Sequence, residues 1–513
     1  MNEATLAARV LDALLREDYA GLRRFARGRT LDLPGGGRRS VRLIGGGFLS
    51  THVVDPAQDL RLDDVLALVR SLADPRDDVA AFERECREML ATARLHESAQ
   101  PAVLERLARL PDELRVGPGA YYETLAAYTD HPVHPMGRCR LGLEPEDLER
   151  HAPEFAPTFP MHWARVPSER VTEMGVLPEW WPGDGLFPVH PLTVPHLTGV
   201  TFAPEPRVPV APTLSMRSMV VEADRLTHLK VPLPTSTLGL RNRRTIVPRT
   251  LPDGALAERL LRRVLQEEPR LPILLADEQT YGHADSPLLA YLVRRFPPET
   301  ARAHVVPVAA LLARAPEGGF VIERWDVPTL FGAYLDALLS WNVTLFRRGI
   351  ALEAHQQNVS LVLDAAFPQD GLEGGGLKLL VKDYDGTLVL GDGESHEGSF
   401  IDPRMATQDP EALARVFVTI TLHLCAAAPA FGLAERGLLP LPDGLAMIRD
   451  RLDAALGPGD AFLRARTLDA GTLPTKAMVT AGTLVDKART GSADINKHYG
   501  PPGPNYLRDD TCC

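Results

Sequence analysis

The sequence predicts an α+β protein, because segments with helical periodicity and segments with strand character occupy separate blocks of the chain. Residues 1–30 and 59–115 carry helical patterns, whereas residues 117–255 are dense in proline and contain short extended runs. From about residue 326 the pattern is a helix, then antiparallel strands, then further helices.

A chain of 513 residues is too long for one hydrophobic core, so we expect several domains. The pattern predicts a helix-rich N-terminal domain at 1–125 and a mixed, proline-rich and basic domain at 126–325. The remaining residues, 326–513, are expected to form a domain of antiparallel sheet and helices with a helical C-terminus.

Apolar residues at three- and four-residue spacing predict the N-terminal helices, beginning with an amphipathic helix that places Leu6, Val10 and Leu14 on one face. Three further helices are expected at Asp63–Leu72, Asp78–His96 and Val103–Leu110. Between them, Arg38–Val54 predicts a pair of strands joined around Gly45–Gly47. This glycine triplet lacks the context of a phosphate-binding loop, so we interpret it as a turn.

In the middle of the chain, the runs Met219–Val221 and Leu229–Leu233 predict strands separated by turns. Residues 255–268 and 284–295 are predicted to be helical from their apolar spacing. The tail from about residue 488 is polar and rich in glycine and proline, and we expect it to be loosely ordered.

The C-terminal part begins with a long apolar helix at Leu330–Arg348, followed by Gly349 where a helix C-cap glycine belongs. Two strands are expected after it, and Asp385-Gly386 predicts a hairpin from the second of them to a third. The three strand predictions are Val359–Asp364, Leu377–Asp383 and Thr387–Leu390. Helices are predicted at 410–426 and 443–456.

The composition excludes several classes of protein. A net charge of −11 argues against general nucleic-acid binding. We find no apolar run of membrane-spanning length, since the richest, Ile420–Leu433, is interrupted by His423 and Pro429, and the N-terminus does not resemble a signal peptide. The five cysteines, including the terminal Cys512 and Cys513, form no CxxC pair, which predicts neither a disulfide framework nor a zinc site. A cytoplasmic location fits best.

A polar loop, Glu353–Asn358, lies between the long helix and the first of these strands. The layout places His355, Gln357 and Asn358 at the mouth of a sheet, with Asp383 returning from the second strand. Polar groups on a loop over a rigid scaffold suit a nucleotide and its metal ion. The alternative is a capped loop whose amide side chains only satisfy backbone groups.

The first of two basic stretches, residues 131–142, contains two histidines and two arginines but no acid. Prolines hold this backbone out of a helix, so the four side chains are expected to point in fixed directions. They are His131, His134, Arg138 and Arg140. A solvated loop is the alternative, and metal binding is disfavoured because no carboxylate or thiol accompanies the histidines.

The second basic stretch, Arg225–Arg249, has no acidic residue, and Ser215-Met216-Arg217-Ser218 lies just before it. Its cations are Arg225, Lys230, Arg241, Arg243, Arg244 and Arg249. Arginine forks bind carboxylate and phosphate oxygens in pairs, and hydroxyl groups complete the coordination. The stretch could be a solvated face, but its interleaved apolar residues favour a cleft. Without aromatic interleaving, a small polyanion is a better partner than single-stranded nucleic acid.

Together these three stretches point to an ATP-dependent reaction on an anionic substrate, either carboxylate activation or phosphoryl transfer. A kinase-like phosphotransferase is the enzymatic alternative, because Asn358 and Lys382-Asp383 resemble a kinase catalytic loop. However, Gln357 occupies the position of the catalytic base, and there is no Gly-rich nucleotide loop. A non-catalytic protein that binds citrate or ferric citrate would explain the basic stretches but not the Glu353–Asn358 loop.

Several short motifs occur in one order over roughly residues 120–480. They are His131-Pro-x-His-Pro-x-x-Arg138-x-Arg140-x-Gly142, Pro188-Val-His190-Pro191, Ser215-x-Arg217-Ser218, His228-Leu-Lys230, Glu353-Ala-His355-x-Gln357-Asn358, Lys382-Asp383 and Lys476-Ala477. This ordered set resembles the NRPS-independent siderophore (NIS) synthetases, the aerobactin synthetase-like family. The resemblance implies a cupped hand of thumb, fingers and palm, with a loosely kinase-like palm and usually a homodimer. It implies adenylation of a carboxylate, typically citrate or a derivative, with ATP and magnesium, and displacement of AMP by an amine or hydroxyl.

The resemblance also implies roles for individual residues. The ATP phosphates would be held by Ser215, Arg217, Ser218 and Lys230. His355, Gln357 and Asn358 would bridge nucleotide and carboxylate, and Glu353, Asn358 and Asp383 would bind magnesium. His131, His134, Arg138, Arg140, Thr237 and Arg241 would contact the substrate, with Arg243 or Arg244 as alternatives to Arg241.

A carboxylate is already ionised at pH 7, so its attack on the α-phosphate needs positioning and charge neutralisation rather than a base. Arg217, Lys230 and Arg241 could supply positive charge, and His355 could assist proton loss from the second substrate. The chain departs from the family with Arg138 in place of lysine and Ser218 in place of threonine. It also has no arginine at 480–482, and these departures bear on the acyl substrate more than on the reaction.

Overall fold

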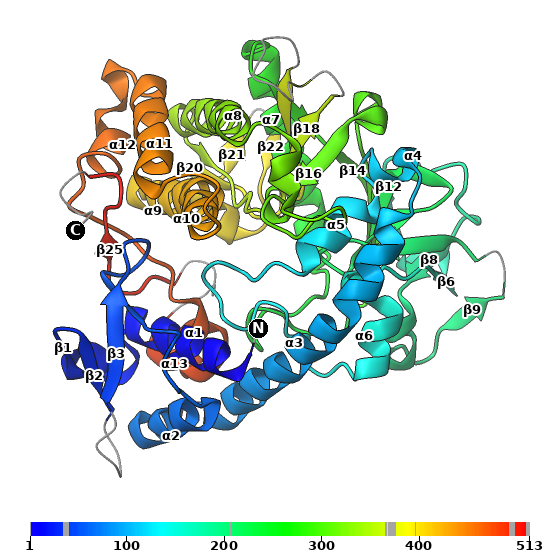
Figure 1. The fold of residues 1–513 in the computed structure, drawn as a ribbon. Coiled ribbons are helices and arrows are strands. Elements are labelled where there is room, and N and C mark those ends of the chain that lie inside the picture. Colours follow the sequence, from blue (N-terminus) through cyan, green and yellow to red (C-terminus); the bar gives the residue numbers. More distant parts are fainter. Residues whose placement is uncertain are drawn as a thin grey trace.

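The structure of the protein is a computed structural model that describes residues 2–33, 40–204, 207–364, 367, 376–395, 397–491 and 498–508. It is a mixed fold in which helices and several sheets surround a common centre (Figure 1). The predicted α+β class is confirmed at this level. The predicted Cys512-Cys513 tail lies outside the described residues.

The N-terminal part joins helices to a small antiparallel sheet. Its helices are α1 (Glu3–Arg16), α2 (Leu62–Leu72), α3 (Val79–Ala108), α4 (Asp112–Arg115) and α5 (Ala120–Ala127). Its sheet has the order β1 (Ala26–Arg27), β2 (Thr30–Asp32), β3 (Ser40–Gly45) and β4 (His52–Val54). Leu6, Val10 and Leu14 are completely buried, which confirms the predicted face of α1. The two helices predicted before and after Pro101 are one continuous helix, α3.

The middle of the chain builds a seven-stranded sheet and a three-stranded one. The larger sheet has the order β5 (Phe159–Pro160), β10 (Pro209–Pro212), β11 (Ser218–Val221), β12 (Asp224–Lys230), β15 (Leu289–Arg295), β14 (Asp277–Ser286) and β7 (Thr172–Met174). The smaller has the order β8 (Leu186–Val189), β6 (His162–Arg165) and β9 (Thr201–Ala203), and α6 (Pro145–His151) and α7 (Thr250–Glu267) flank this region.

The helix predicted at 284–295 is wrong, because these residues belong to β14 and β15. β15 is buried along almost its whole length and on both faces, so its apolar residues do not alternate with polar ones. A short apolar run of this kind cannot be told from a buried helix by its periodicity.

The C-terminal part contains α8 (Val327–Arg347), which is followed by Gly349 with a positive φ of 70°, as expected for a glycine just after a helix. Beneath it lies a four-stranded sheet with the order β13 (Ile273–Leu275), β19 (Leu377–Val381), β18 (Val359–Leu363) and β16 (His304–Pro307). β13 pairs with β19 in parallel, so the prediction of a wholly antiparallel sheet is wrong for this pair.

The hairpin predicted at Asp385-Gly386 is also wrong. β20 (Leu388–Leu390) pairs with β17 (Ile350–Ala351) and β23 (Ala406–Thr407), not with β19. β19 already has β18 on one edge and β13 on the other, so it has no free edge for a third partner. The remaining short strands are β21 (Glu394–Ser395), β22 (Gly398–Ser399), β24 (Thr472–Leu473) and β25 (Gly503–Pro504).

The C-terminal helices are α9 (Pro410–Val416), α10 (Ala428–Glu435), α11 (Leu441–Ala455), α12 (Ala461–Ala465) and α13 (Lys487–Thr490). A π-helical segment, Phe417–Ala427, joins α9 to α10 and makes one helix of 26 residues. This helix is long and apolar enough to cross a membrane, which corrects the prediction that no such run exists. Its apolar window is 89% buried inside the protein, as in a core helix.

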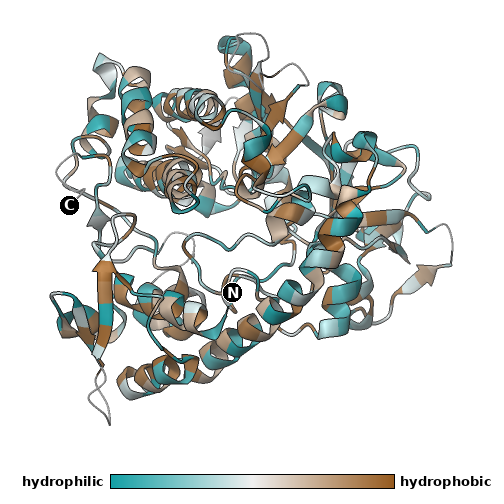
Figure 2. Ribbon diagram, in the orientation of Figure 1, coloured by the Kyte–Doolittle hydropathy of each residue, from teal (hydrophilic) through white to brown (hydrophobic). Residues whose placement is uncertain are grey.

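The two ends of the chain share one hydrophobic cluster. Val479 and Leu484 pack with residues of α1, α2 and α3, and Figure 1 shows α13 beside α1. In Figure 2, β3 is brown along much of its length, whereas α3 alternates between brown and teal as an amphipathic helix does. The C-terminal segment therefore returns to the N-terminal helices. The domain boundaries near residues 125 and 325 stay predictions.

Candidate active site

Two adjoining cavities occupy the centre of the protein. The first cavity, of about 270 Å³, is lined by residues from the His131–Arg140 stretch, the loop at 237–244 and the Glu353–Asn358 loop. The second cavity, of about 220 Å³, is lined mainly by residues 242–254 and 383–387. Both are lined by Arg217, Asn242, Glu353, Asp383, Asp385 and Gly386. The basic stretches and the polar loop therefore meet at one place.

The Glu353–Asn358 loop lies where the sequence predicts it. His355 donates its backbone N–H to Glu353 O (2.9 Å), and Asn358 donates its own to His355 O (2.8 Å). Lys382 N–H then donates to Asn358 O over 3.1 Å, which ties the loop to the end of β19. His355, Gln357, Asn358 and Asp383 all line the first cavity, so the structure brings these four together.

His355 is uncharged at neutral pH. Burial lowers its pKa to about 4, with Lys476 and Arg244 acting in the same direction against the opposing effect of Asp383. Its Nδ1 accepts a long hydrogen bond from Gln357 N–H (3.4 Å), which assigns the proton of the neutral ring to Nε2. The ring can therefore donate a hydrogen bond into the cavity, but it is a weak base.

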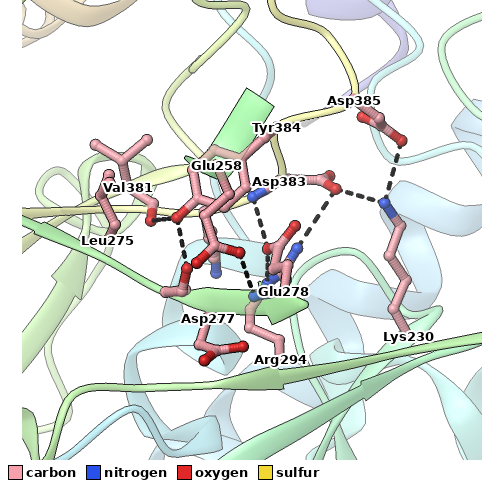
Figure 3. Close-up of polar contacts among 12 residues, drawn as sticks. Lys230, Glu258, Leu275, Asp277, Glu278, Arg294, Val381, Asp383, Tyr384 and Asp385 are labelled. Carbon is pink, nitrogen blue, oxygen red and sulfur yellow. Dashed lines mark hydrogen bonds and ion pairs between the residues drawn. The ribbon is translucent and has the colours of Figure 1, made fainter. Parts of the chain in front are cut away.

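Asp383 is the centre of a charge network at the junction of the cavities (Figure 3). Lys230 contacts its carboxylate and lies 3.4 Å from Asp385, while Arg294 lies 3.4 Å from Asp383 and contacts Glu278. Burial alone would raise the pKa of Asp383, but the lysine and the arginine outweigh it and hold the pKa well below its usual range. Asp383 is therefore an ionised carboxylate facing both cavities.

The backbone at Asp383 is strained, with a φ of 69°. Its N–H donates to Glu278 Oε1 over 2.8 Å, and the next residue, Tyr384, donates its hydroxyl to Ala276 O over 2.7 Å. These bonds hold the turn after β19 in a fixed position (Figure 3). Sequence reasoning missed Glu278 and Arg294, because β14 and β15 were not recognised as strands of this sheet.

Three guanidinium groups converge on the first cavity. Arg217 donates from Nη1 to Thr245 O (2.8 Å), and Arg140 donates to Gly137 O (3.2 Å). Arg244 is partly buried, and its buried Nε has no hydrogen-bond partner among the residues that the structure describes. Burial, followed by Arg217 and Arg140, lowers the pKa of Arg244 to about 9, so the group stays charged at pH 7. The charge and donor groups of Arg140, Arg217 and Arg244 are suited to an anion.

The other residues of the first basic stretch differ in their positions. Arg138 lines the first cavity but pairs with Asp130 (2.7 Å), which also pairs with Arg9 (2.9 Å). His131 lines the cavity as well. His134 lies in neither cavity and is completely buried, which lowers its pKa to about 3.

The structure separates two more predicted site residues from the cavities. Ser218 is buried and donates its N–H to Ser215 Oγ (3.0 Å), while Ser215 itself lines the first cavity. Arg241 lines neither cavity, because its Nη1 donates to Ala481 O over 2.6 Å. Arg244 lies with Thr237 in the first cavity instead, and Arg243 lines the second. Of the three candidate arginines, the first cavity is therefore lined by Arg244 and not by Arg241, and which of them contacts the substrate stays a prediction.

The predicted magnesium ligands can be tested by their surroundings. The described residues contain no group of three His, Cys, Asp or Glu side chains able to hold a metal alone. Glu353 and Asp383 line both cavities, and Asn358 lines the first. Both carboxylates already face a cation, since Glu353 pairs with Lys476 over 3.1 Å and Asp383 pairs with Lys230. These donors fit a Mg²⁺ ion that takes most of its ligands from phosphate and water.

Two family models match the chain, each over one part of it. The model of the IucA / IucC family matches residues 120–180 and 181–313, which carry the basic stretches and the Arg217 turn. This part of the chain, residues 120–313, belongs to the IucA / IucC family. A second model, described as ferric iron reductase FhuF-like transporter, matches residues 329–491 of the chain.

The chain is similar to proteins that are named as synthases of staphyloferrin and aerobactin. It is 24% identical over 352 residues to staphyloferrin B synthase of Staphylococcus aureus, which covers 57% of this chain and 58% of that protein. It is 25% identical over 325 residues to aerobactin synthase of Escherichia coli, covering 51% of this chain and 54% of that protein. The chain thus matches between half and two thirds of the length of these curated relatives.

Two solved structures share the fold over nearly the whole chain. The ATP-bound aerobactin synthetase IucA of Klebsiella pneumoniae has a TM-score of 0.73 at 16% identity, with 99% of each chain covered. The petrobactin biosynthesis protein AsbB of Bacillus anthracis has a TM-score of 0.75 at 15% identity, covering 98% of this chain and 95% of that one. At these identities the likeness concerns the fold.

Proposed function

We propose that the protein is an ATP-dependent, AMP-forming ligase of siderophore biosynthesis. It adenylates a carboxylate, which is citrate or a derivative of citrate or of a dicarboxylate, and condenses it with an amine or a hydroxyl group. The observation that carries this proposal is the cluster of Arg140, Arg217 and Arg244 in the first cavity, next to the Lys230–Asp383 pair at the junction with the second cavity. The printed names of the relatives support the same assignment.

In this proposal each cavity receives one part of the reaction. The second cavity has an apolar wall that suits a nucleoside, made of Ile246, Val247, Leu251, Leu292 and Met405. Arg217 and Lys230 lie where the triphosphate would cross the junction, and Ser215 would add a hydroxyl group. The carboxylate would take the first cavity, where Arg244 offers its unpartnered Nε.

The first chemical step needs no base, because the carboxylate is ionised at pH 7. Its oxygen forms a bond to the α-phosphorus while the bond to the β-phosphate oxygen breaks and pyrophosphate leaves. Arg217, Lys230 and Arg244 lower the barrier by neutralising charge on the phosphates and by orienting the carboxylate. In the second step the amine or hydroxyl forms a bond to the acyl carbon, the bond from that carbon to the AMP oxygen breaks, and the nucleophile releases its proton to water.

His355 acts in this scheme as a neutral hydrogen-bond donor near the acyl group, because a pKa of about 4 leaves it uncharged. Gln357 and Asn358 add amide contacts to nucleotide or carboxylate. Mg²⁺ would be held by Asp383, Glu353 and Asn358 together with phosphate oxygens, and it would supply further neutralisation of negative charge.

The proposal includes the wider properties that the family resemblance implies. These are a cupped hand of thumb, fingers and palm, a homodimeric assembly and a cytoplasmic location. A small organic acid and an amine or alcohol are the expected substrates, and neither nucleic acid nor membrane is an expected partner.

A screen of carboxylic acids for ATP-dependent pyrophosphate release, with hydroxylamine as the nucleophile, tests the proposal. We expect citrate or a related acid to give AMP and a hydroxamate. Formation of ADP instead of AMP would identify a phosphotransferase. Calorimetric binding of citrate or ferric citrate without binding of ATP would identify a non-catalytic binding protein.

A further inference from the structure

Two buried glutamates of the N-terminal helices hold a turn near the opposite end of the chain. Glu17, just after α1, accepts hydrogen bonds from the backbone N–H of Val479 (3.1 Å) and of Thr480 (2.8 Å) and from Thr480 Oγ1 (2.8 Å). Glu85, on α3, accepts from Thr483 Oγ1 over 2.6 Å. The two glutamates are only 8% and 1% exposed. Buried carboxyl oxygens are costly without hydrogen-bond partners, and the turn supplies partners for both oxygens of Glu17 and for Oε2 of Glu85.

The turn that these glutamates hold is the π-helical Thr480–Leu484, and on its upstream side it continues into the first cavity. Lys476 pairs there with Glu353 over 3.1 Å, and Met478 lines the cavity wall. Only three residues separate Lys476 from Thr480, so a shift of the turn moves the lysine with it.

On its other side the same turn binds the loop at 236–244. Arg241 donates its backbone N–H to Gly482 O (3.0 Å) and its guanidinium to Ala481 O (2.6 Å). Leu240 donates its N–H to Thr483 Oγ1 over 2.8 Å, so this hydroxyl links the loop directly to the hydrogen bond with Glu85.

The two backbones touch at the tip of this loop. A Cβ atom on Gly239 would lie 2.7 Å from Gly482 Cα, and the φ of Gly239 is 108°, a conformation that favours glycine. Beyond this contact the loop carries Thr237, Asn242 and Arg244 into the first cavity. The position of the turn therefore sets the position of these three side chains.

We propose that Glu17 and Glu85 are positioning residues for the carboxylate side of the site. They act by fastening the Thr480–Leu484 turn, which places Lys476 on one side and the Arg244 loop on the other. No residue of α1 or α3 lines either cavity, and the hydrogen bonds of Glu17 and Glu85 lead to the turn rather than to the cavity wall. That the ligand on this side is a carboxylate rests on the proposed function. The hydrogen-bonded connection from the two glutamates through the turn to the Arg244 loop does not.

The test compares full-length variants Glu17→Gln, Glu85→Gln and Thr483→Val with wild type in steady-state pyrophosphate release, using citrate and ATP as probes. Glu83→Gln is the matched control, because Glu83 is on the same helix but pairs with Arg70. Each variant removes or weakens a buried hydrogen bond to the turn, so we expect the KM for citrate to rise about tenfold. The KM for ATP should change less than about twofold, because Lys230 is fixed elsewhere.

An equal rise of both KM values, or a loss of active enzyme with both KM values unchanged, would overturn the proposal and leave these glutamates a merely structural role. If none of the carboxylic acids tested supports AMP formation by the wild-type protein, the proposed function fails instead. Hydrogen exchange then tests the link between the glutamates and the loop by itself. We expect Glu17→Gln and Thr483→Val to speed amide exchange in both 477–484 and 236–244. Faster exchange confined to 477–484 would also overturn it.

Discussion

Lys382 Nζ donates a hydrogen bond to Glu123 Oε1 over 2.8 Å, and each side chain is only about 6% exposed. The other oxygen of Glu123 accepts the N–H of Leu214 over 3.0 Å. One carboxylate thus joins α5, the strand end that carries Asp383 and the turn that carries Ser215 and Arg217. Lys382 belongs to a motif of the site, yet its cation is used inside the protein rather than in a cavity.

The first prediction concerns this buried ion pair. Lys382→Met leaves Glu123 as an uncompensated buried charge, which typically costs about 3–5 kcal/mol of unfolding free energy. Lys378→Met, on the same strand, is the matched control, because Lys378 and its partner Glu299 are about half exposed and such pairs contribute about 0–1 kcal/mol. Urea denaturation of both variants measures the difference, and equal stability of the two would contradict this view of Glu123.

The second prediction concerns the arginine cluster. Arg217→Ala should lower carboxylate-dependent AMP formation by about 10²-fold or more, since it removes a charge at the junction of both cavities. Arg244→Ala should mainly raise the KM for the carboxylate, by about tenfold, because Arg244 lines only the first cavity. Arg259→Ala, a half-exposed position on α7, is the control. Near-normal turnover of Arg217→Ala would remove this arginine from the mechanism.

The elements nearest the site were predictable because their patterns are local. α8 has strong helical periodicity and a glycine at its end, and β18 and β19 are short apolar runs between polar loops. The positions of His355, Asn358 and Asp383 followed from these elements alone.

What could not be predicted depends on contacts between distant segments. The sequence does not reveal the position of Arg294, because β15 is buried on both faces and its apolar residues do not alternate with polar ones. Such a run cannot be distinguished from a buried helix by its periodicity. Arg244 lines the first cavity and Arg241 does not because of the path of their loop. This loop passes through positive φ angles at Leu238 (55°) and Gly239 (108°). Spacing does not reveal such a path, and Arg241 turns to the C-terminal segment instead.

The third prediction concerns magnesium. Asp383→Asn removes the carboxylate that faces both cavities, so the Mg²⁺ concentration for half-maximal activity should rise about tenfold or more. Lys230 and Arg294 would lose a shared counter-charge, so the unfolding free energy must be measured beside the Mg²⁺ titration. A folded variant with an unchanged Mg²⁺ titration would exclude Asp383 as a ligand.

The last prediction concerns acid stability and rests on His423, in the buried helix between α9 and α10. Its Nδ1 lies 2.8 Å from Tyr506 Oη and its Nε2 lies 2.9 Å from Pro474 O, so the neutral ring accepts one hydrogen bond and donates the other. Burial lowers its pKa to about 4, while the unfolded chain takes up a proton near pH 6.5. Below pH 6.5 the unfolded state therefore binds more protons than the folded one, and stability falls as the pH falls toward 4.

At pH 5 this difference amounts to about 2 kcal/mol for His423 alone, from 1.36 kcal/mol for each of about 1.5 pH units. His423→Asn should lower stability at pH 7, because it breaks the bonds to Tyr506 and Pro474. It should also reduce the slope of unfolding free energy against pH between pH 6.5 and 5, by up to about 1.36 kcal/mol per pH unit, which is the contribution of one proton. Denaturation at several pH values gives both slopes, and parallel slopes for wild type and variant would show that His423 does not stay neutral in the folded protein.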